Sequence, residues 1–150
     1  MTFCFHHIST DESYGDLPHL NSVCIRAALS LHTELTTYVP SCQYSSLKAS
    51  CDHMACVGCH TYALPTIVTN YPNNDGPYHS SEQLIPLIIF DVLLVKPLSA
   101  YRNCEQTSNW LYVEGSMCAL YKVVAKGKNC EAYNIAGLNK CQNIEVANDI

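Results

Sequence analysis

The chain has 150 residues, of which 48% are hydrophobic and 14% charged, and its formal net charge is −5. Such a chain can bury the core of one domain, which argues against disorder, and the absence of any Lys and Arg cluster excludes the electrostatic footprint of a nucleic-acid-binding protein. The longest apolar stretch, 84–95, is interrupted by Pro86 and Asp91 and is shorter than the roughly 20 residues that cross a bilayer. No signal-peptide pattern follows Met1, so we expect no membrane partner and a cytoplasmic location.

The ten cysteines are scattered from Cys4 to Cys141 rather than gathered in a loop-rich scaffold. Reduced thiols are therefore the expectation. Cys56 and Cys59 form one C-x-x-C motif with His53 and His60 nearby, and a zinc site is the alternative because tetrahedral zinc takes four such ligands. No second pair follows at a suitable spacing, so we predict no metal.

The pattern of apolar residues, turn formers and caps predicts the elements in chain order. They are a strand over 3–8, a long active-site loop over 16–40, a helix over 43–61 with Ser41 as its N-cap, a strand over 64–70, a turn over 72–76, a helix over 82–95, a short strand over 98–101, a helix over 113–125 with Leu120, Val123 and Val124 on one side, a strand over 132–135 and a helix from Asn143.

The alternation of strands and helices predicts an α/β fold with a parallel sheet. A dinucleotide-binding fold normally opens with a strand, a G-x-G-x-x-G turn and a helix that holds the pyrophosphate, but the six glycines of this chain are dispersed. We therefore expect the C-terminal part of a Rossmann-like sheet, without the glycine-rich first half, plus part of a small substrate-binding subdomain. The expected division places the later Rossmann strands and the catalytic helix in about 1–78 and most of the substrate-binding region in 79–150.

Tyr44 and Lys48 form a Tyr-x-x-x-Lys motif, which on a helix places a phenol and an ammonium one turn apart. A tyrosine is a poor base at neutral pH, and an adjacent positive charge lowers its pKa by favouring the phenolate. The pair can thus accept a proton from a substrate hydroxyl. A surface helix that carries the two residues by chance is the alternative.

Thr10, Asp11 and Glu12 follow the first predicted strand. Two adjacent carboxyl groups can act as acid and base when their surroundings separate their pKa values, which is what the elimination of water requires. A helix N-cap or a solvated loop is the alternative interpretation of these three residues.

The two motifs occur together, with 9–15 preceding 44–48. With runs such as 64–70 and 110–114, they resemble the 4,6-dehydratases of the extended short-chain dehydrogenase/reductase superfamily, and among these the dTDP-glucose 4,6-dehydratases. The resemblance covers nearly the whole chain. It implies NAD as cofactor, dTDP-glucose or a related nucleotide sugar as substrate, and an assembly that can be a homodimer.

In the reaction that the resemblance implies, Tyr44 takes the proton of the sugar 4-hydroxyl while hydride passes from C4 to NAD. Lys48 holds the ribose and tunes Tyr44. Thr10 hydrogen-bonds the substrate, Glu12 removes the C5 proton, and Asp11 protonates the departing 6-hydroxyl before hydride returns to C6.

The resemblance also assigns binding residues. The nicotinamide-side contacts are Tyr44, Lys48 and Asn74. The substrate contacts are Thr10, Asn73, Gln83, Leu84, Ser99, Tyr101, Ser108 and Asn143. At three of these positions the chain departs from the family pattern, because Gln83 replaces a lysine, Ser108 an arginine and Ser99 a proline. The loss of two cations would weaken the binding of a diphosphate, since a charge-assisted hydrogen bond contributes about 1.5–3 kcal/mol.

Two functions follow as alternatives. The chain is an enzyme of this type, completed by a separate glycine-rich segment, or it is a catalytically inactive remnant or interaction module that retains part of the fold. A sheet without its first strands would expose an edge and apolar helix faces, so poor solubility is also expected.

Overall fold

The computed structural model describes residues 3–15, 32–97, 107–137 and 139–150. The strand expected over 98–101, and residues 16–31 of the expected loop, lie outside the described residues. The elements, in chain order, are β1 (Phe5–Thr10), the 3-10 helix η1 (Asp11–Tyr14), α1 (Gln43–Tyr62), β2 (Thr66–Tyr71), β3 (Asn73–Asp75), α2 (Leu84–Leu93), β4 (Thr107–Tyr112), α3 (Val113–Lys126), β5 (Glu131–Asn134), β6 (Asn139–Gln142) and α4 (Asn143–Asp149).

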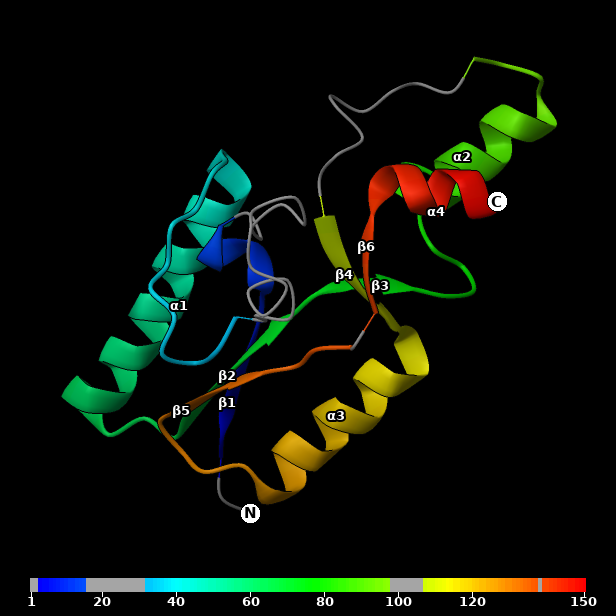
Figure 1. Ribbon diagram of the computed structural model, residues 1–150. Coiled ribbons are helices and arrows are strands. Elements are labelled where there is room, and N and C mark those ends of the chain that lie inside the picture. The colour runs from blue at the N-terminus through cyan, green and yellow to red at the C-terminus, as the bar shows by residue number, and fades with distance from the viewer. Residues whose placement is uncertain (1–2, 16–31, 98–106, 138) are drawn as a thin grey trace.

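The first sheet has the strand order β1-β2-β5, and both pairings are parallel. Every residue of its central strand, β2, is buried, which explains the run of β-branched residues in that segment. Figure 1 shows α1 on one side of this sheet and α3 on the other. The predicted α/β fold with a parallel sheet is confirmed.

Helix α1 begins at Gln43, as predicted, but its N-cap is Cys42 rather than Ser41. The Cys42 sulfur accepts a hydrogen bond from the Ser45 N–H, and the Ser45 hydroxyl accepts one from the Cys42 N–H, which forms a capping box. The helix ends where Ala63 adopts a left-handed conformation with φ 53°. The first helical turn, which carries Tyr44, is thus held at a defined point of the chain.

Two polar contacts hold α1 against β1. His7 Nε2 lies 3.0 Å from Oδ1 of Asp52, whose side chain is fully buried on the helix. Lys48 Nζ donates a hydrogen bond to the Ile8 carbonyl oxygen at 3.2 Å. Because the two contacts lie one turn apart on α1, they orient the helix along the strand.

The second sheet has the order β3-β4-β6, with β3 parallel and β6 antiparallel to β4. Only Pro72 separates the end of β2 from the start of β3, so the second sheet begins at the carboxyl end of the first. Figure 1 shows α2 and α4 beside this second sheet. None of its three strands was predicted, because the segment of β3 has the composition of a turn and that of β6 is polar.

Helix α3 agrees with the predicted helix, although only part of its predicted apolar side is buried. Val123 is buried, whereas Val124 is exposed. After α3 the chain returns to the first sheet as β5, which pairs with β2. Across the described ranges, no helix is both long and apolar enough to cross a membrane.

The expectation of reduced thiols is wrong for one pair, because Cys59 and Cys130 form a disulfide. Their Cα atoms lie 5.8 Å apart, within the usual range for a disulfide, although 71 residues separate them in sequence. The bond joins the last turns of α1 to the start of β5. Cys59 therefore cannot serve the zinc site that was the alternative interpretation of its C-x-x-C motif.

Candidate active site

The acid pair lies on η1, immediately after the carboxyl end of β1. Thr10 is the N-cap of this 3-10 helix, and its hydroxyl accepts a hydrogen bond from the Glu12 N–H at 3.3 Å. The N-cap interpretation and the functional one are therefore compatible, since the cap fixes the turn on which Asp11 and Glu12 lie. Gly15 ends the turn with φ 89°, and a Cβ there would lie 2.4 Å from the Val39 carbonyl oxygen.

Buried hydrogen bonds hold this turn at the carboxyl ends of β2 and β5. The Tyr14 hydroxyl donates to Asn134 Oδ1 at 2.8 Å and accepts from Asn70 Nδ2 at 2.9 Å. Asn70 Nδ2 also donates to the Tyr38 hydroxyl at 3.0 Å. Because Asn70 and Tyr14 are both buried, the network fixes the position of the two acids.

Asp11 has the pKa expected of a general acid. Burial, and secondarily the charge of Glu12, raise the pKa of Asp11 from 3.8 to about 7, against the opposing effect of hydrogen bonds from backbone N–H groups. At neutral pH a large share of Asp11 therefore carries a proton. A carboxyl in this state can donate a proton to a departing hydroxyl.

Tyr44 and Lys48 lie on the first two turns of α1 and line one cavity. Burial, followed by the charges of Glu12 and Cys42, raises the pKa of Tyr44. The expectation that Lys48 would lower this pKa is wrong for the structure, because the Lys48 ammonium donates to the Ile8 carbonyl and the nearby carboxylate opposes the phenolate.

A cavity of about 670 Å³ brings together residues from β1, η1, α1, β3 and the start of α2. The predicted site residues that line it are Thr10, Glu12, Tyr44, Lys48, Asn73, Asn74 and Gln83. The Tyr-x-x-x-Lys motif and Glu12 of the acid pair therefore meet at one cavity, as the reaction that the family resemblance implies would require. Asn74 is held there by a hydrogen bond that its Oδ1 accepts from the buried Ser116 hydroxyl.

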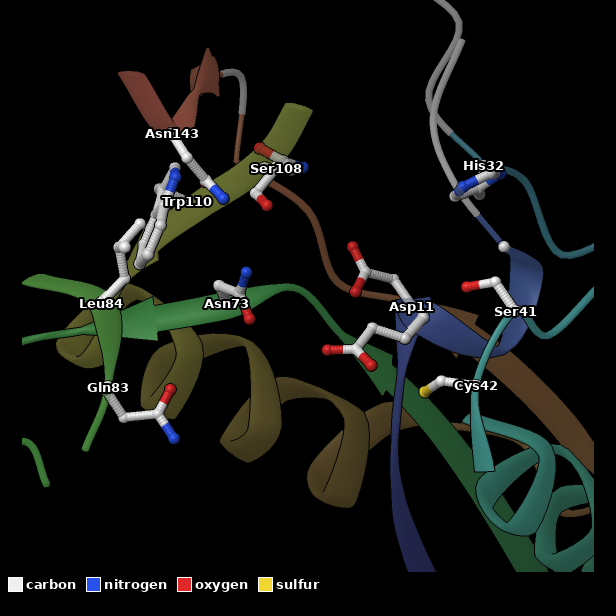
Figure 2. Close-up of a pocket in the computed structure, with 13 residues that line it drawn as sticks. Asp11, His32, Ser41, Cys42, Asn73, Gln83, Leu84, Ser108, Trp110 and Asn143 are labelled. Carbon is white, nitrogen blue, oxygen red and sulfur yellow. The ribbon is translucent and has the colours of Figure 1, made fainter. Parts of the chain in front are cut away.

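A second cavity, of about 290 Å³, adjoins the first (Figure 2). The predicted site residues that line it are Asp11, Glu12, Asn73, Gln83, Leu84, Ser108 and Asn143. Figure 2 shows Asp11 on one side of this cavity and Asn73, Leu84 and Asn143 on the other. The two predicted substrate residues Ser99 and Tyr101 lie outside the described residues.

Among the residues that the structure describes, four line both cavities: Glu12, Asn73, Gln83 and Trp110. Three of them were predicted, and Trp110 was not. It lies opposite Asn73 in the pairing of β3 with β4. The sequence shows no periodicity that would have assigned it to the site, because the pairing of these two strands joins segments far apart in the chain.

The larger cavity suits the nicotinamide-ribose end of NAD. Besides Tyr44 and Lys48 it is lined by Ser9, whose hydroxyl is buried without a hydrogen-bond partner among the described residues. Buried hydroxyls usually have partners, so Ser9 is suited to a polar ligand. A glycine-rich turn for the pyrophosphate is absent from the sequence, so the fit extends to this end of the cofactor only.

A parallel α/β sheet with a Tyr-x-x-x-Lys helix beside an acid turn is typical of the class of the extended short-chain dehydrogenases/reductases. The family model described as GDP-mannose 4,6 dehydratase matches residues 1–150, and the chain belongs to this family. Within it the chain is similar to dTDP-glucose 4,6-dehydratases. One from Escherichia coli is 55% identical over 148 residues, which cover 99% of this chain and 41% of the relative. One from Neisseria meningitidis serogroup B is 50% identical over 148 residues, which cover 99% of this chain and 39% of that relative.

The solved structures agree. A dTDP-glucose 4,6-dehydratase from Bacillus anthracis str. Ames, in complex with NAD, superimposes with a TM-score of 0.86 at 39% identity, over 97% of this chain and 44% of that one. A dTDP-glucose 4,6-dehydratase from Streptomyces venezuelae, with NAD bound, gives a TM-score of 0.85 at 29% identity, over 96% of this chain and 42% of that one. The chain thus spans about 40% of the length of the curated relatives it matches.

Proposed function

We propose that this chain carries the catalytic residues of a dTDP-glucose 4,6-dehydratase, which oxidises a nucleotide sugar at C4, eliminates water across C5 and C6 and reduces C6. The observation that carries the proposal is that the acid turn and the Tyr-x-x-x-Lys helix meet at adjoining cavities with shared walls. The names of the relatives support the same activity and NAD as cofactor. In this proposal the protein acts in the cytoplasm, and a homodimer is the expected assembly.

In this proposal the side chains take the roles that the family resemblance implies, and their places in the two cavities support these roles. Tyr44 accepts the proton of the sugar 4-hydroxyl, and Thr10 and Asn73 hold the ring. Glu12 removes the C5 proton, and Asp11, whose raised pKa keeps it largely protonated at neutral pH, protonates the departing 6-hydroxyl.

Tyr44 requires a positive charge near its phenol to act as a base, because burial and Glu12 raise its pKa. Lys48 supplies such a charge when its ammonium leaves the Ile8 carbonyl for the ribose hydroxyls. The chemistry that bound NAD supplies is hydride acceptance from C4 and hydride donation to C6. Tyr44, Lys48, Ser9 and Asn74 would line the nicotinamide-ribose end.

A catalytically inactive remnant or interaction module is the second candidate. It is favoured by Gln83 and Ser108, which line the smaller cavity where the family resemblance implies a lysine and an arginine. Neither side chain carries a positive charge to pair with a diphosphate, so a nucleotide sugar would bind more weakly.

The test is turnover. The chain is incubated with NAD and dTDP-glucose, alone and with the N-terminal segment of the Escherichia coli relative, and the 4-keto-6-deoxy product is followed by NMR. We expect product, and Tyr44→Phe should lower the rate by about 10²–10⁴-fold because it removes the general base. If the wild type is no faster than Tyr44→Phe, both alone and with the added N-terminal segment, the proposed enzymatic function is rejected in favour of the inactive remnant.

A further inference from the structure

Of the described residues that line both cavities, Trp110 is the one to which neither the motifs nor the family resemblance assigned a role in the site. It lies in β4, paired in register with Asn73 of the adjacent parallel strand. Residues in register on parallel strands present their side chains to the same face of a sheet. Trp110 therefore shares the face that carries Asn73, a predicted substrate contact.

The indole N–H of Trp110 is a hydrogen-bond donor that no described residue uses. The residue is only 8% exposed, and its Nε1 has no hydrogen-bond partner among the described residues. A buried tryptophan N–H usually finds a partner, and leaving such a donor unpaired costs free energy. A purely structural aromatic residue would not need this donor at the wall of a cavity.

Asn143 supplies a complementary group on the same wall. Its Oδ1 is also buried without a partner among the described residues, and it lines the smaller cavity with Trp110. Figure 2 shows both side chains on the wall that faces Asp11. Among the described residues, one wall thus offers a donor and an acceptor that no other group pairs with, which suits a ligand rich in hydroxyl or phosphoryl oxygens.

We propose that Trp110 is a substrate-contacting residue whose indole N–H donates a hydrogen bond to an oxygen of the nucleotide sugar where the two cavities join. The proposal rests on the proposed function for the identity of the ligand, but it requires binding only and no turnover. The acceptor is either a sugar hydroxyl or a phosphoryl oxygen, and the two sources can be distinguished by experiment.

The chain contains one tryptophan, so its NMR spectrum has a single indole N–H resonance. We expect saturating dTDP-glucose to shift this ¹H–¹⁵N resonance and to slow its exchange with solvent. A shift with dTDP alone would identify a phosphoryl oxygen as the acceptor, and a shift that needs dTDP-glucose would identify a sugar hydroxyl. Ligand shifts elsewhere in the spectrum with an unmoved indole resonance would overturn the proposal, whatever the turnover assay shows.

Trp110→Phe provides the second measurement, because it keeps an aromatic ring and removes the donor. We expect calorimetry to show a lower affinity for dTDP-glucose than that of the wild type, by about three- to tenfold if the lost acceptor is a sugar hydroxyl and by about tenfold or more if it is a charged phosphoryl oxygen. Tyr121→Phe, which removes a hydroxyl from an exposed ring on α3, is the matched control and should bind like the wild type. Equal affinity of a folded Trp110→Phe would overturn the proposal, and no binding by the wild type would overturn it together with the proposed function.

Discussion

Asp11 shows how burial turns an ordinary carboxyl into a proton donor. It lies beside Glu12 on a turn that hydrogen bonds of the buried Tyr14 and Asn70 hold in place, so the backbone keeps the two acids next to each other. The pKa of Asp11 rises mainly because of burial and only secondarily because of Glu12. The sequence shows the acid pair, but only the folded chain raises the pKa of Asp11.

We expect the ¹³C carboxyl resonance of Asp11 to titrate with a midpoint near 7 rather than 3.8. Glu12→Gln should lower this midpoint only in part, since burial is the larger cause. Because the folded-state pKa is raised, the stability contributed by protonated Asp11 is complete below pH 3.8 and is lost as the pH rises through about 7. The free energy of unfolding of Asp11→Asn, measured by urea denaturation, should fall less over this pH range than that of the wild type. An NMR titration midpoint near 4 for Asp11 in the wild type would contradict the expected rise in its pKa.

At the scale of the elements, helix α1 is fixed to the first sheet near both of its ends. In the second turn, Lys48 donates a hydrogen bond to the backbone of β1, and one turn later Asp52 contacts His7 of the same strand. Near the end of the helix, Cys59 forms a disulfide with Cys130, just before β5. The first turns of α1, which carry Tyr44 and Lys48, are thus part of a rigid helix rather than of a loop. Such support is what a site needs to hold its groups in place.

The disulfide should contribute to stability, because it closes a loop with a sequence separation of 71 residues in the unfolded chain. We expect Cys59→Ser to lower the free energy of unfolding by about 3–4 kcal/mol, as measured by urea denaturation. Cys56→Ser, which removes an exposed thiol one turn earlier on α1, should have little effect. Dithiothreitol should destabilise the wild type and Cys56→Ser alike and leave Cys59→Ser unchanged; insensitivity of the wild type would argue against the bond.

At the scale of the whole molecule, apolar side chains remain at the surface of α2 and just beyond its end. The exposed residues are Ile89, Phe90, Val92, Leu93, Leu94 and Val95. Their grouping on one segment exceeds the scattered apolar residues of an ordinary surface. It agrees with the expectation of poor solubility, which rested on the sequence alone.

We expect the double variant Phe90→Gln and Leu93→Gln to raise the soluble yield and to reduce both light scattering and the fluorescence of bound anilinonaphthalene sulfonate. Both side chains are exposed, so their replacement should leave the fold intact. Leu35→Gln, an exposed residue away from α2, is the control and should change little. A monodisperse wild-type monomer that binds no dye and melts cooperatively would be the contrary result.

Much of the first sheet could be predicted from local pattern. The helix over 43–61 matches α1 to within one residue, and the β-branched run after Leu64 matches β2 shifted by one or two residues, because periodicity and turn formers act within a few residues. Strands β4 and β6 were missed, because TSNWLY and NKCQ have no clean alternation and become strands by pairing with each other.

The sequence by itself determined the family, through the order of its motifs, and the spacing of Tyr44 and Lys48, because four residues make about one helical turn. The tertiary structure alone decided that Glu12 and Tyr44 share a cavity, that Trp110 joins them there and that Cys59 meets Cys130. It also decided the pKa of Asp11. The physical reason is that burial, cavities and charge interactions depend on groups brought together from distant parts of the chain, which no local pattern encodes.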